Sequence, residues 1–231
     1  MRSAKAIFIK QAKDIFRNPM ALIQFIIFPA VALIMTELVE KPNKDIPHNM
    51  FITMMSAIFA GMALITTMAG VIAEDKERKS VRFLIMAGVK PHEYIMGTGG
   101  FILLAGVIVS VVFGLIGDFT GTEFAKFLTV MIASTVASIM LGASIGMLTK
   151  NQQAAIAVAM PVAVILGFTP MIASFNETVE KVARVLYTQQ LNVVVNDFST
   201  SFSKAMTVIG INIGILLVLF TLAYKKKGLK G

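Results

Sequence analysis

The residues best suited to chemistry lie in one dense charged segment, 74–79, which reads Glu-Asp-Lys-Glu-Arg-Lys. In a helix, Glu74 and Arg78 would pair at i, i+4 on one face. An apolar run, Phe-Leu-Ile-Met at 83–86, follows after a short gap. Such a run is costly to leave in water, so it is expected to meet lipid headgroups or a groove in another protein. The pattern is typical of a contact surface and not of bond-breaking chemistry.

Motifs for catalysis and nucleotide binding are absent from the sequence. It contains no His-Glu-x-x-His, no Gly-x-Ser-x-Gly and no Gly-x-x-x-x-Gly-Lys-Ser/Thr, and it has 2 histidines and no cysteine. Metal-dependent and serine hydrolysis, thiol chemistry, disulfides and direct ATP hydrolysis are therefore not expected. We expect no catalytic residue, no bound cofactor and no metal site. Any energy from ATP and Mg²⁺ must come from another polypeptide.

The elements that position the charged segment are six long windows without Asp, Glu, Lys or Arg. A helix needs about 20 apolar residues to cross the hydrocarbon layer of a bilayer. The sequence therefore predicts an all-α, polytopic membrane protein, a single transmembrane domain over residues 1–231. The predicted spans are 19–37, 50–73, 94–117, 126–149, 152–175 and 205–224.

The distribution of basic residues predicts the orientation of the chain. Lys and Arg number 21 and give a net charge of +8, and most of them lie before the first span, in segment 74–93 and in the tail after residue 224. Basic residues beside a span resist translocation, so both ends and segment 74–93 are predicted to be cytoplasmic. The positive charge is thus read as a topology signal, and no nucleic-acid partner is expected.

Residues 1–18 are predicted to form an amphipathic helix on the inner leaflet. Phe8 and Ile15 fall on its apolar arc with Ala4, Ala12 and Phe16, and basic residues that include Arg17 fall opposite. Pro19 then suits the first turn of the next helix, where its missing N–H costs little. The alternative is a solvated charged leader without a function of its own.

Small residues recur every four positions within two spans, at Ser134, Ser138, Gly142 and Gly146, and again at Gly210 and Gly214. Such ridges let helix backbones approach closely in lipid, and packing within one bundle is the favoured interpretation. Away from their ends, the predicted spans carry no carboxylate or histidine, which ion-coupled carriers usually need.

The segment 176–204, on the outer side, is predicted to contain a short helix capped by Asn176. Val179, Val182 and Leu186 follow helical spacing, and Glu180 can pair with Arg184 on the polar side. An ordinary loop helix in or near the outer interface accounts for this pattern.

The charged segment also carries a family resemblance. Glu74, Glu77, Arg78, Leu84 and Pro91 occupy places that match the membrane subunits of the type-2 ABC exporter family, and the order of elements is similar over nearly the whole chain. The resemblance implies a dimer of permease subunits, identical or paired with a sister, bound to two cytosolic ATPase subunits. It further implies that segment 74–93 couples to the ATPase and that Val179, Val182 and Leu186 shape an outer gate. The coupling residues would be Glu74, Asp75, Lys76, Glu77, Arg78, Phe83, Leu84 and Pro91.

These observations lead to the hypothesis of a permease subunit in the cell membrane. It would export an amphipathic or hydrophobic cargo, such as a peptide, drug or lipid, with power from a separate ATPase subunit. Apolar spans and 16 methionines favour such a cargo, because methionine surfaces adapt to varied shapes. The alternatives are a membrane anchor or sensor that does not transport, and a passive channel.

Overall fold

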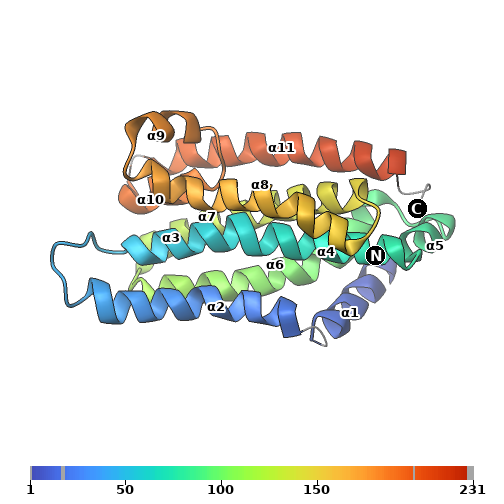
Figure 1. Ribbon diagram of the computed structural model, residues 1–231, viewed down its shortest axis with the longest axis horizontal. Coiled ribbons are helices and arrows are strands. Elements are labelled where there is room, and N and C mark those ends of the chain that lie inside the picture. Colours follow the sequence, from blue (N-terminus) through green and yellow to red (C-terminus); the bar gives the residue numbers. More distant parts are fainter. Residues whose placement is uncertain (1, 17–18, 200, 228–231) are drawn as a thin grey trace.

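The computed structural model describes residues 2–16, 19–199 and 201–227, and the part described is helical (Figure 1). It contains 6 helices long and apolar enough to cross a membrane. In chain order these are α2 (Pro19–Met35) with the π-helical η1 (Thr36–Glu40), then α3 (Met50–Ile58) continued by the π-helical η2 (Phe59–Ala63) and α4 (Leu64–Glu77), and then α6 (Pro91–Ile116), α7 (Gly121–Leu148), α8 (Gln152–Ala173) and α11 (Phe202–Lys227).

Four shorter helices lie at the two ends of this bundle. Helices α1 (Arg2–Phe16) and α5 (Ser80–Met86) lie at one end, the end at which α11 finishes, and we call this the termini end. Helices α9 (Glu177–Ala183) and α10 (Gln189–Asn196) lie at the other end with the loop from 41 to 49, and we call this the far end. An even number of spans brings the two ends of a chain to one side, as Figure 1 shows.

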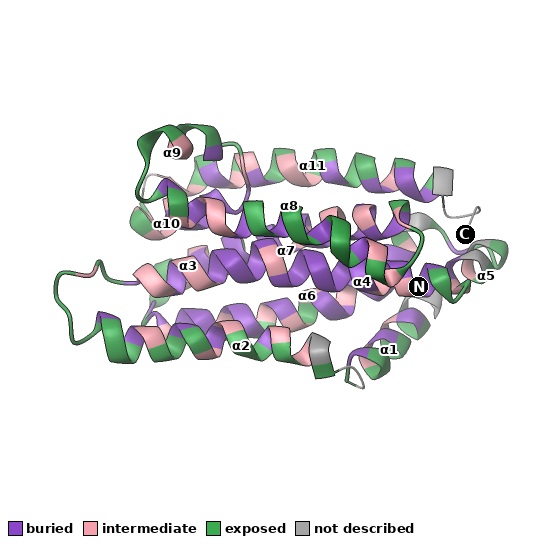
Figure 2. Ribbon diagram, in the orientation of Figure 1, coloured by how far each residue is buried: buried purple, intermediate pink, exposed green. Residues whose placement is uncertain are grey.

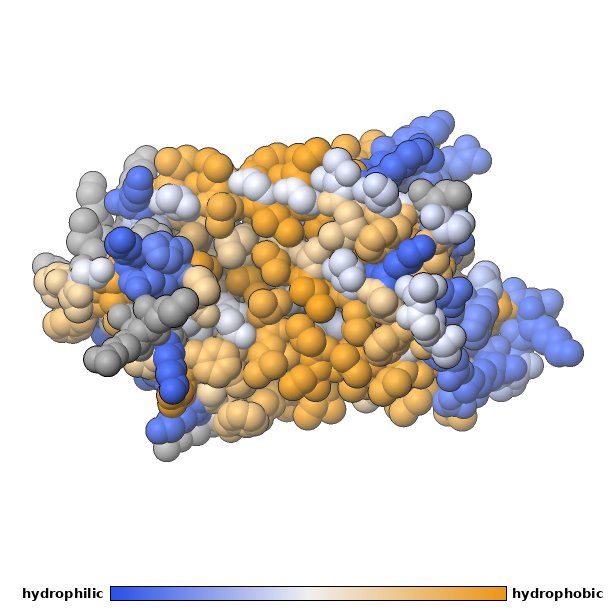
Figure 3. Space-filling view, turned by 180° about the vertical axis from the view of Figure 1, so that it is seen from behind, coloured by the Kyte–Doolittle hydropathy of each residue, from blue (hydrophilic) through white to orange (hydrophobic). Residues whose placement is uncertain are grey.

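The surface matches a bilayer. Figure 3 shows apolar side chains in a band across the middle of the molecule, with hydrophilic residues gathered at both ends. Burial within the bundle is uneven: the most apolar window of Met50–Glu77 is 83% buried, against 22% for the windows of Leu22–Glu40 and Phe202–Lys225 (Figure 2). The continuous helix α3–η2–α4 is therefore the central rod, and α2 and α11 present their apolar faces outward.

The ridge of small residues on α7 packs directly against the central rod. A Cβ placed on Gly142 would lie 2.5 Å from the carbonyl oxygen of Ile65, and one placed on Gly146 would lie 2.5 Å from that of Ala69. Only glycine permits this approach of two backbones, which confirms packing within the bundle as the role of the ridge. Gly210 and Gly214 of α11, by contrast, have nothing within 4 Å of such a Cβ.

Several boundaries differ from the predicted ones. Helix α4 continues to Glu77, beyond the predicted end of the second span at residue 73, and the chain then turns before α5 starts at Ser80. The fourth span starts at Gly121, five residues before the predicted 126. Pro19 is the first residue of α2, as predicted.

Helix α1 packs against α6 through part of its predicted apolar arc. Ile15 is buried, Phe8 is half-buried against the core, and the Phe8 and Phe101 rings meet edge to face with centroids 5.8 Å apart. Phe16 is exposed instead of buried, and Ile7 takes a core position. Arg17 and Asn18, predicted to end this helix, lie outside the described residues.

Candidate functional site

Asp75, in the last turn of α4, holds three helices together at the termini end. Its side chain is 6% exposed, and its Oδ1 accepts a hydrogen bond from Lys10 Nζ of α1. Its Oδ2 accepts one from Tyr94 Oη of α6 at 3.1 Å. A buried carboxylate is costly unless it is paired and hydrogen-bonded, and here both oxygens have donors. Asp75 therefore ties α1 and α6 to the end of the central rod.

The charge on Lys10 is secured by its surroundings. Burial lowers the pKa of the ammonium, but the hydrogen bonds and negative charges of Asp75 and Asp14 outweigh that effect and raise the pKa above its ordinary value of 10.5. Asp14 lies 3.3 Å from Lys10 Nζ on the same helix. Lys10 therefore keeps its positive charge at neutral pH.

Lys76 ties the same turn to α7. Its ammonium donates to the carbonyl oxygens of Met147 at 2.9 Å and Thr149 at 2.7 Å, at the C-terminal end of α7. The last carbonyls of a helix lack partners within the helix and carry its negative dipole end, so a buried lysine suits this position. The side chain is correspondingly buried.

The turn itself is compact and charged. Arg78 pairs with Glu74 at 2.7 Å, as the i, i+4 spacing predicted, and Lys79 takes a left-handed backbone conformation with φ 59°. Glu77 Oε2 accepts a hydrogen bond of 3.2 Å from the backbone N–H of Gln152, the first residue of α8. Through Asp75, Lys76 and Glu77, one helical turn thus contacts α1, α6, α7 and α8.

Helix α5 is short and has a well-defined C-terminus. Gly88 has φ +81°, a conformation that costs glycine nothing, and the N–H of Val89 donates back to the carbonyl of Leu84 at 3.0 Å, which together form a Schellman C-terminus. Tyr224 Oη of α11 also donates to the carbonyl of Val89 at 3.3 Å. These bonds fix the orientation of α5 relative to α6 and α11.

This orientation turns apolar side chains outward. Phe83 is 64% exposed and Met86 61% exposed, whereas Val81 is buried and Leu84 is half-buried against the core. Phe83 and Met86 lie on α5, beyond the ends of the membrane-spanning helices. Large exposed apolar side chains at such a place mark a contact surface.

The far end carries the residues predicted to shape an outer gate. Asn176 caps α9 by accepting hydrogen bonds from the N–H groups of Thr178 and Val179, as predicted. Arg184 pairs with Glu180 at 3.0 Å, also as predicted. Val182 is 71% exposed, and Val179 and Leu186 are half-buried. Their role at a gate stays a prediction.

A buried tyrosine anchors this end to the centre of the bundle. Tyr187 Oη and Ser138 Oγ of α7 lie 2.8 Å apart, and Ser138 Oγ donates to the carbonyl of Ala60 at 2.6 Å. Ala60 belongs to η2, where π-helical winding leaves carbonyls available for such bonds. Burial raises the pKa of Tyr187 more than its hydrogen bond with Ser138 lowers it, so the phenol stays neutral.

The comparisons with known proteins agree with this architecture. A family model described as ABC-2 family transporter protein matches residues 20–225. The chain belongs to the ABC-2 transporter family. It is a multi-pass membrane protein and the membrane component of a transporter of this type. A search of characterised proteins finds no match.

Family membership carries two further consequences. Membrane subunits of this family typically lack a catalytic domain, and the family implies an ATPase as partner. The predicted coupling residues do lie together at the termini end, but they face different ways. Asp75 and Lys76 point into the bundle, whereas Glu77, Arg78 and Phe83 are exposed. Pro91 starts α6, and its side chain lies outside what the structure describes, as do those of Arg82 and Ile85.

Some residues of this site escaped sequence reasoning. Lys10 and Tyr94 lie 65 and 19 positions from Asp75, so no local spacing signals their contact. Tyr187 lies in the predicted outer segment 176–204, 49 positions from Ser138, so no spacing signals their contact. For Lys10 and Asp75 the sequence offers only their opposite charges as a signal. Those charges fit many other pairings of basic and acidic residues equally well.

Proposed function

We propose that this subunit is the permease of an ATP-driven exporter. It moves an amphipathic or hydrophobic cargo out of the cell, and a separate cytosolic ATPase subunit docks on the termini end. The ATPase binds ATP and Mg²⁺. The docking surface comprises the exposed side chains of the turn and α5, namely Glu77, Arg78, Phe83 and Met86.

The single observation that carries this proposal is the exposed apolar pair on α5. Phe83 and Met86 lie on a helix whose orientation is fixed by the Schellman C-terminus and by Tyr224. Apolar side chains held outward on a firm support, with charged residues beside them, have the composition of a protein-binding surface with a central anchor.

The contacts beneath this surface support transmission into the membrane. A force on α5 or on the turn reaches α7 through Lys76, α8 through Glu77, and both α1 and α6 through Asp75. Asp75 and Lys76 therefore act as positioning residues under the docking surface, and the exposed residues make the contact.

The assembly that we propose has two permease subunits, identical or paired with a sister subunit, and two ATPase subunits. The resemblance of segment 74–93 to family members supports this stoichiometry. The excess of basic residues at the termini end supports its placement in the cytoplasm.

The test is retention of the ATPase. The subunit is coexpressed with a cytosolic ABC ATPase from the same genome that it retains, and the complex is captured through a tag on the subunit. We expect the double variant Phe83→Asp, Met86→Asp to retain at least about tenfold less ATPase, because both apolar anchors are lost. Val182→Asp, an equally exposed apolar residue at the far end, is the matched control and should retain the wild-type amount. Equal retention by all three proteins would exclude α5 as the docking surface.

A further inference from the structure

Helix α1 is amphipathic, but protein covers the face that an interfacial helix ordinarily gives to lipid. Ile7, Gln11 and Ile15 are 6%, 3% and 3% exposed, and the helix packs along α6. A helix that lies free on a bilayer buries its apolar face among the lipids. In this protein that face is already occupied, so any contact of α1 with the membrane is made by the opposite face.

The opposite face of α1 carries basic and apolar residues in one row. Lys5, Ile9, Lys13 and Phe16 follow one another at helical spacing, so they share one face of the helix. All four are exposed, with Ile9 at 45% and Phe16 at 67%. We call these four residues the outer stripe.

One end of the outer stripe lies beside a membrane-spanning helix. The ring of Phe16 meets that of Phe101 edge to face, with centroids 5.8 Å apart. Phe101 lies well inside α6, about 15 Å along the helix from its start at Pro91. The first membrane-spanning helix, α2, begins at Pro19, shortly after Phe16, and α1 runs obliquely from there toward the termini end (Figure 1). Phe16 therefore lies at the depth of the lipids, and the outer stripe leads from there into the headgroup layer.

The two lysines of the outer stripe have no acidic partner in the part of the chain that the structure describes. Asp14 is the acidic residue of α1, and it pairs with Lys10. Lys10 also pairs with Asp75, whereas no ion pair among the described residues involves Lys5 or Lys13. The outward face of α1 thus presents two positive charges that nothing in the bundle balances.

We propose that the outer stripe binds anionic phospholipids, with Phe16 and Ile9 among the acyl chains and the ammonium groups of Lys13 and Lys5 on the phosphates. Basic residues beside a membrane attract anionic lipid, and a lysine can lay its stem on apolar surface while its charge stays among the headgroups. Charge complementarity therefore favours an anionic over a zwitterionic lipid. This binding requires neither the ATPase nor a cargo, so it goes beyond the function proposed above.

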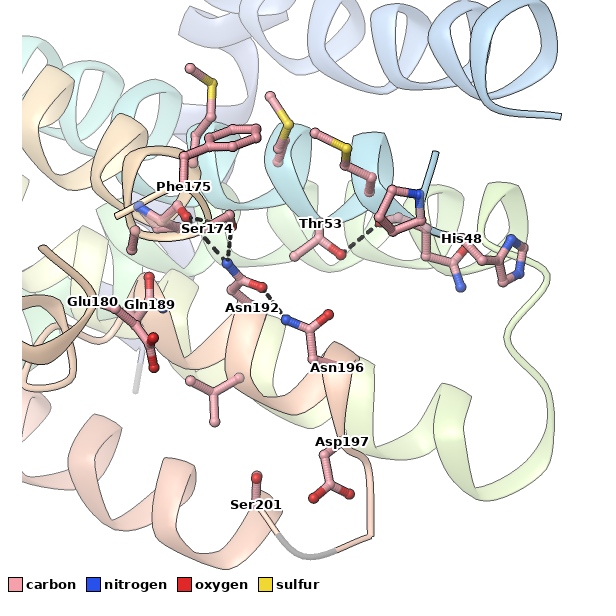
Figure 4. A pocket seen from close by; sticks show the side chains of 18 residues that line it. His48, Thr53, Ser174, Phe175, Glu180, Gln189, Asn192, Asn196, Asp197 and Ser201 are labelled. Atoms are coloured by element: carbon pink, nitrogen blue, oxygen red, sulfur yellow. Dashed lines mark hydrogen bonds between the residues drawn. The ribbon is translucent and has the colours of Figure 1, made fainter. Parts of the chain in front are cut away.

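An equally exposed aromatic residue at the far end has acidic neighbours and supplies a control. Phe175, which follows α8, is 73% exposed. It lines a cavity of about 590 Å³ whose wall includes Glu180 and Asp197 (Figure 4). None of the described residues that line this cavity is Lys or Arg. An anionic lipid thus finds no lysine there of the kind that Lys13 offers beside Phe16.

The test uses a single tryptophan, because the sequence has none of its own. The full chain with Phe16→Trp is reconstituted in bilayers of phosphatidylcholine that contain a minor share of phosphatidylglycerol, which is anionic. Bromine, which quenches tryptophan fluorescence, is carried either by the phosphatidylglycerol or by an equal amount of the phosphatidylcholine. We expect the anionic lipid to bind beside Trp at least about threefold more strongly than the zwitterionic lipid.

The lysines are tested in the same Phe16→Trp protein. The double variant Lys5→Gln, Lys13→Gln should lose the preference for the anionic lipid. The double variant Lys150→Gln, Lys225→Gln is the matched control, because it removes two exposed lysines elsewhere at the termini end and should keep the preference. All four lysines are exposed, and circular dichroism checks that both variants fold.

The far-end reporter Phe175→Trp should show no preference between the two lipids. Equal quenching of the Phe16→Trp protein by the two brominated lipids would overturn the proposal. A preference that survives in Lys5→Gln, Lys13→Gln, or that is equally large at Phe175→Trp, would also overturn it. Absence of quenching at Phe16→Trp by either lipid would do the same and would assign the outer stripe to a protein partner.

Discussion

At the scale of single residues, the buried carboxylate of Asp75 is expected to matter most for the stability of the fold. A surface ion pair contributes little to the free energy of unfolding because water screens it. Loss of a buried carboxylate costs more, because the buried groups that donate hydrogen bonds to it lose their charged acceptor. Lys10 and Tyr94 reach Asp75 from two different helices, so the effect extends beyond one contact.

We therefore expect Asp75→Asn to lower the free energy of unfolding by about 1–3 kcal/mol, because an amide replaces the ionic acceptor of Lys10. Thermal unfolding in a mild detergent measures this change. Asp14→Asn is the control: it also removes a carboxylate near Lys10, but that pair is 45% exposed at both ends, so the change should stay below about 0.5 kcal/mol. Equal effects of the two substitutions would contradict a special role of Asp75.

Local sequence signals predicted the residues whose partners are near in the chain. Glu74 with Arg78, Glu180 with Arg184, and Asn176 as a helix cap all follow from spacing of two to four positions. The partners of Asp75 and Lys76 come from helices far away in sequence, so no local spacing predicts that both residues are buried.

At the scale of elements, the close contact between α7 and the central rod depends on two glycines. The backbone of α4 lies where a side chain on Gly142 or Gly146 would be. Gly210 and Gly214 have the same spacing on α11 but face open space within the described structure. One sequence pattern thus has two different structural meanings.

We expect Gly142→Ala to destabilise the subunit by about 1–3 kcal/mol, since its Cβ would meet a carbonyl oxygen that cannot move freely. Gly214→Ala is the matched control and should be neutral or stabilising by up to about 1 kcal/mol, because alanine favours helix more than glycine does. Thermal unfolding in detergent compares the two, and a larger loss in Gly214→Ala would refute this account of the packing.

The ends of the spans were harder to predict than the spans. The first charged residue set the predicted end at 73, yet α4 continues because Asp75 and Lys76 find buried partners. A Gly or Pro often marks such a break in the sequence, but neither stands at positions 78 and 79. Lys79 itself takes the left-handed conformation at this break.

At the scale of the whole molecule, the apolar band and the two hydrophilic ends define how the subunit sits in a bilayer (Figure 3). Basic residues predict which end faces the cytoplasm, and the bundle places both ends of the chain together. The side of the membrane is open to a direct test because the sequence has no cysteine.

We expect Lys44→Cys, in the far-end loop, to react with a membrane-impermeant maleimide on intact cells. Lys79→Cys, in the turn after α4, should react only after the cells are opened. Both lysines are exposed in the structure, so access to the thiol alone decides the outcome. Labelling of Lys79→Cys on intact cells would invert the orientation and place the docking surface outside.

The central rod reaches from the turn after Glu77 to the far end. Met50–Glu77 spans 28 residues, about 42 Å at the rise of a helix. In the middle of the rod, the π-helical η2 is wound more loosely than the α-helices on either side of it. If η2 tightened to an α-helix, α3 would shift relative to α4 by about one residue of helix, which is roughly 1.5 Å along the axis and a rotation of about 100°. We expect the Ser138 hydroxyl, bonded to Ala60 of η2 and backed by Tyr187, to resist that tightening, so these two side chains would hold the rod in its present winding.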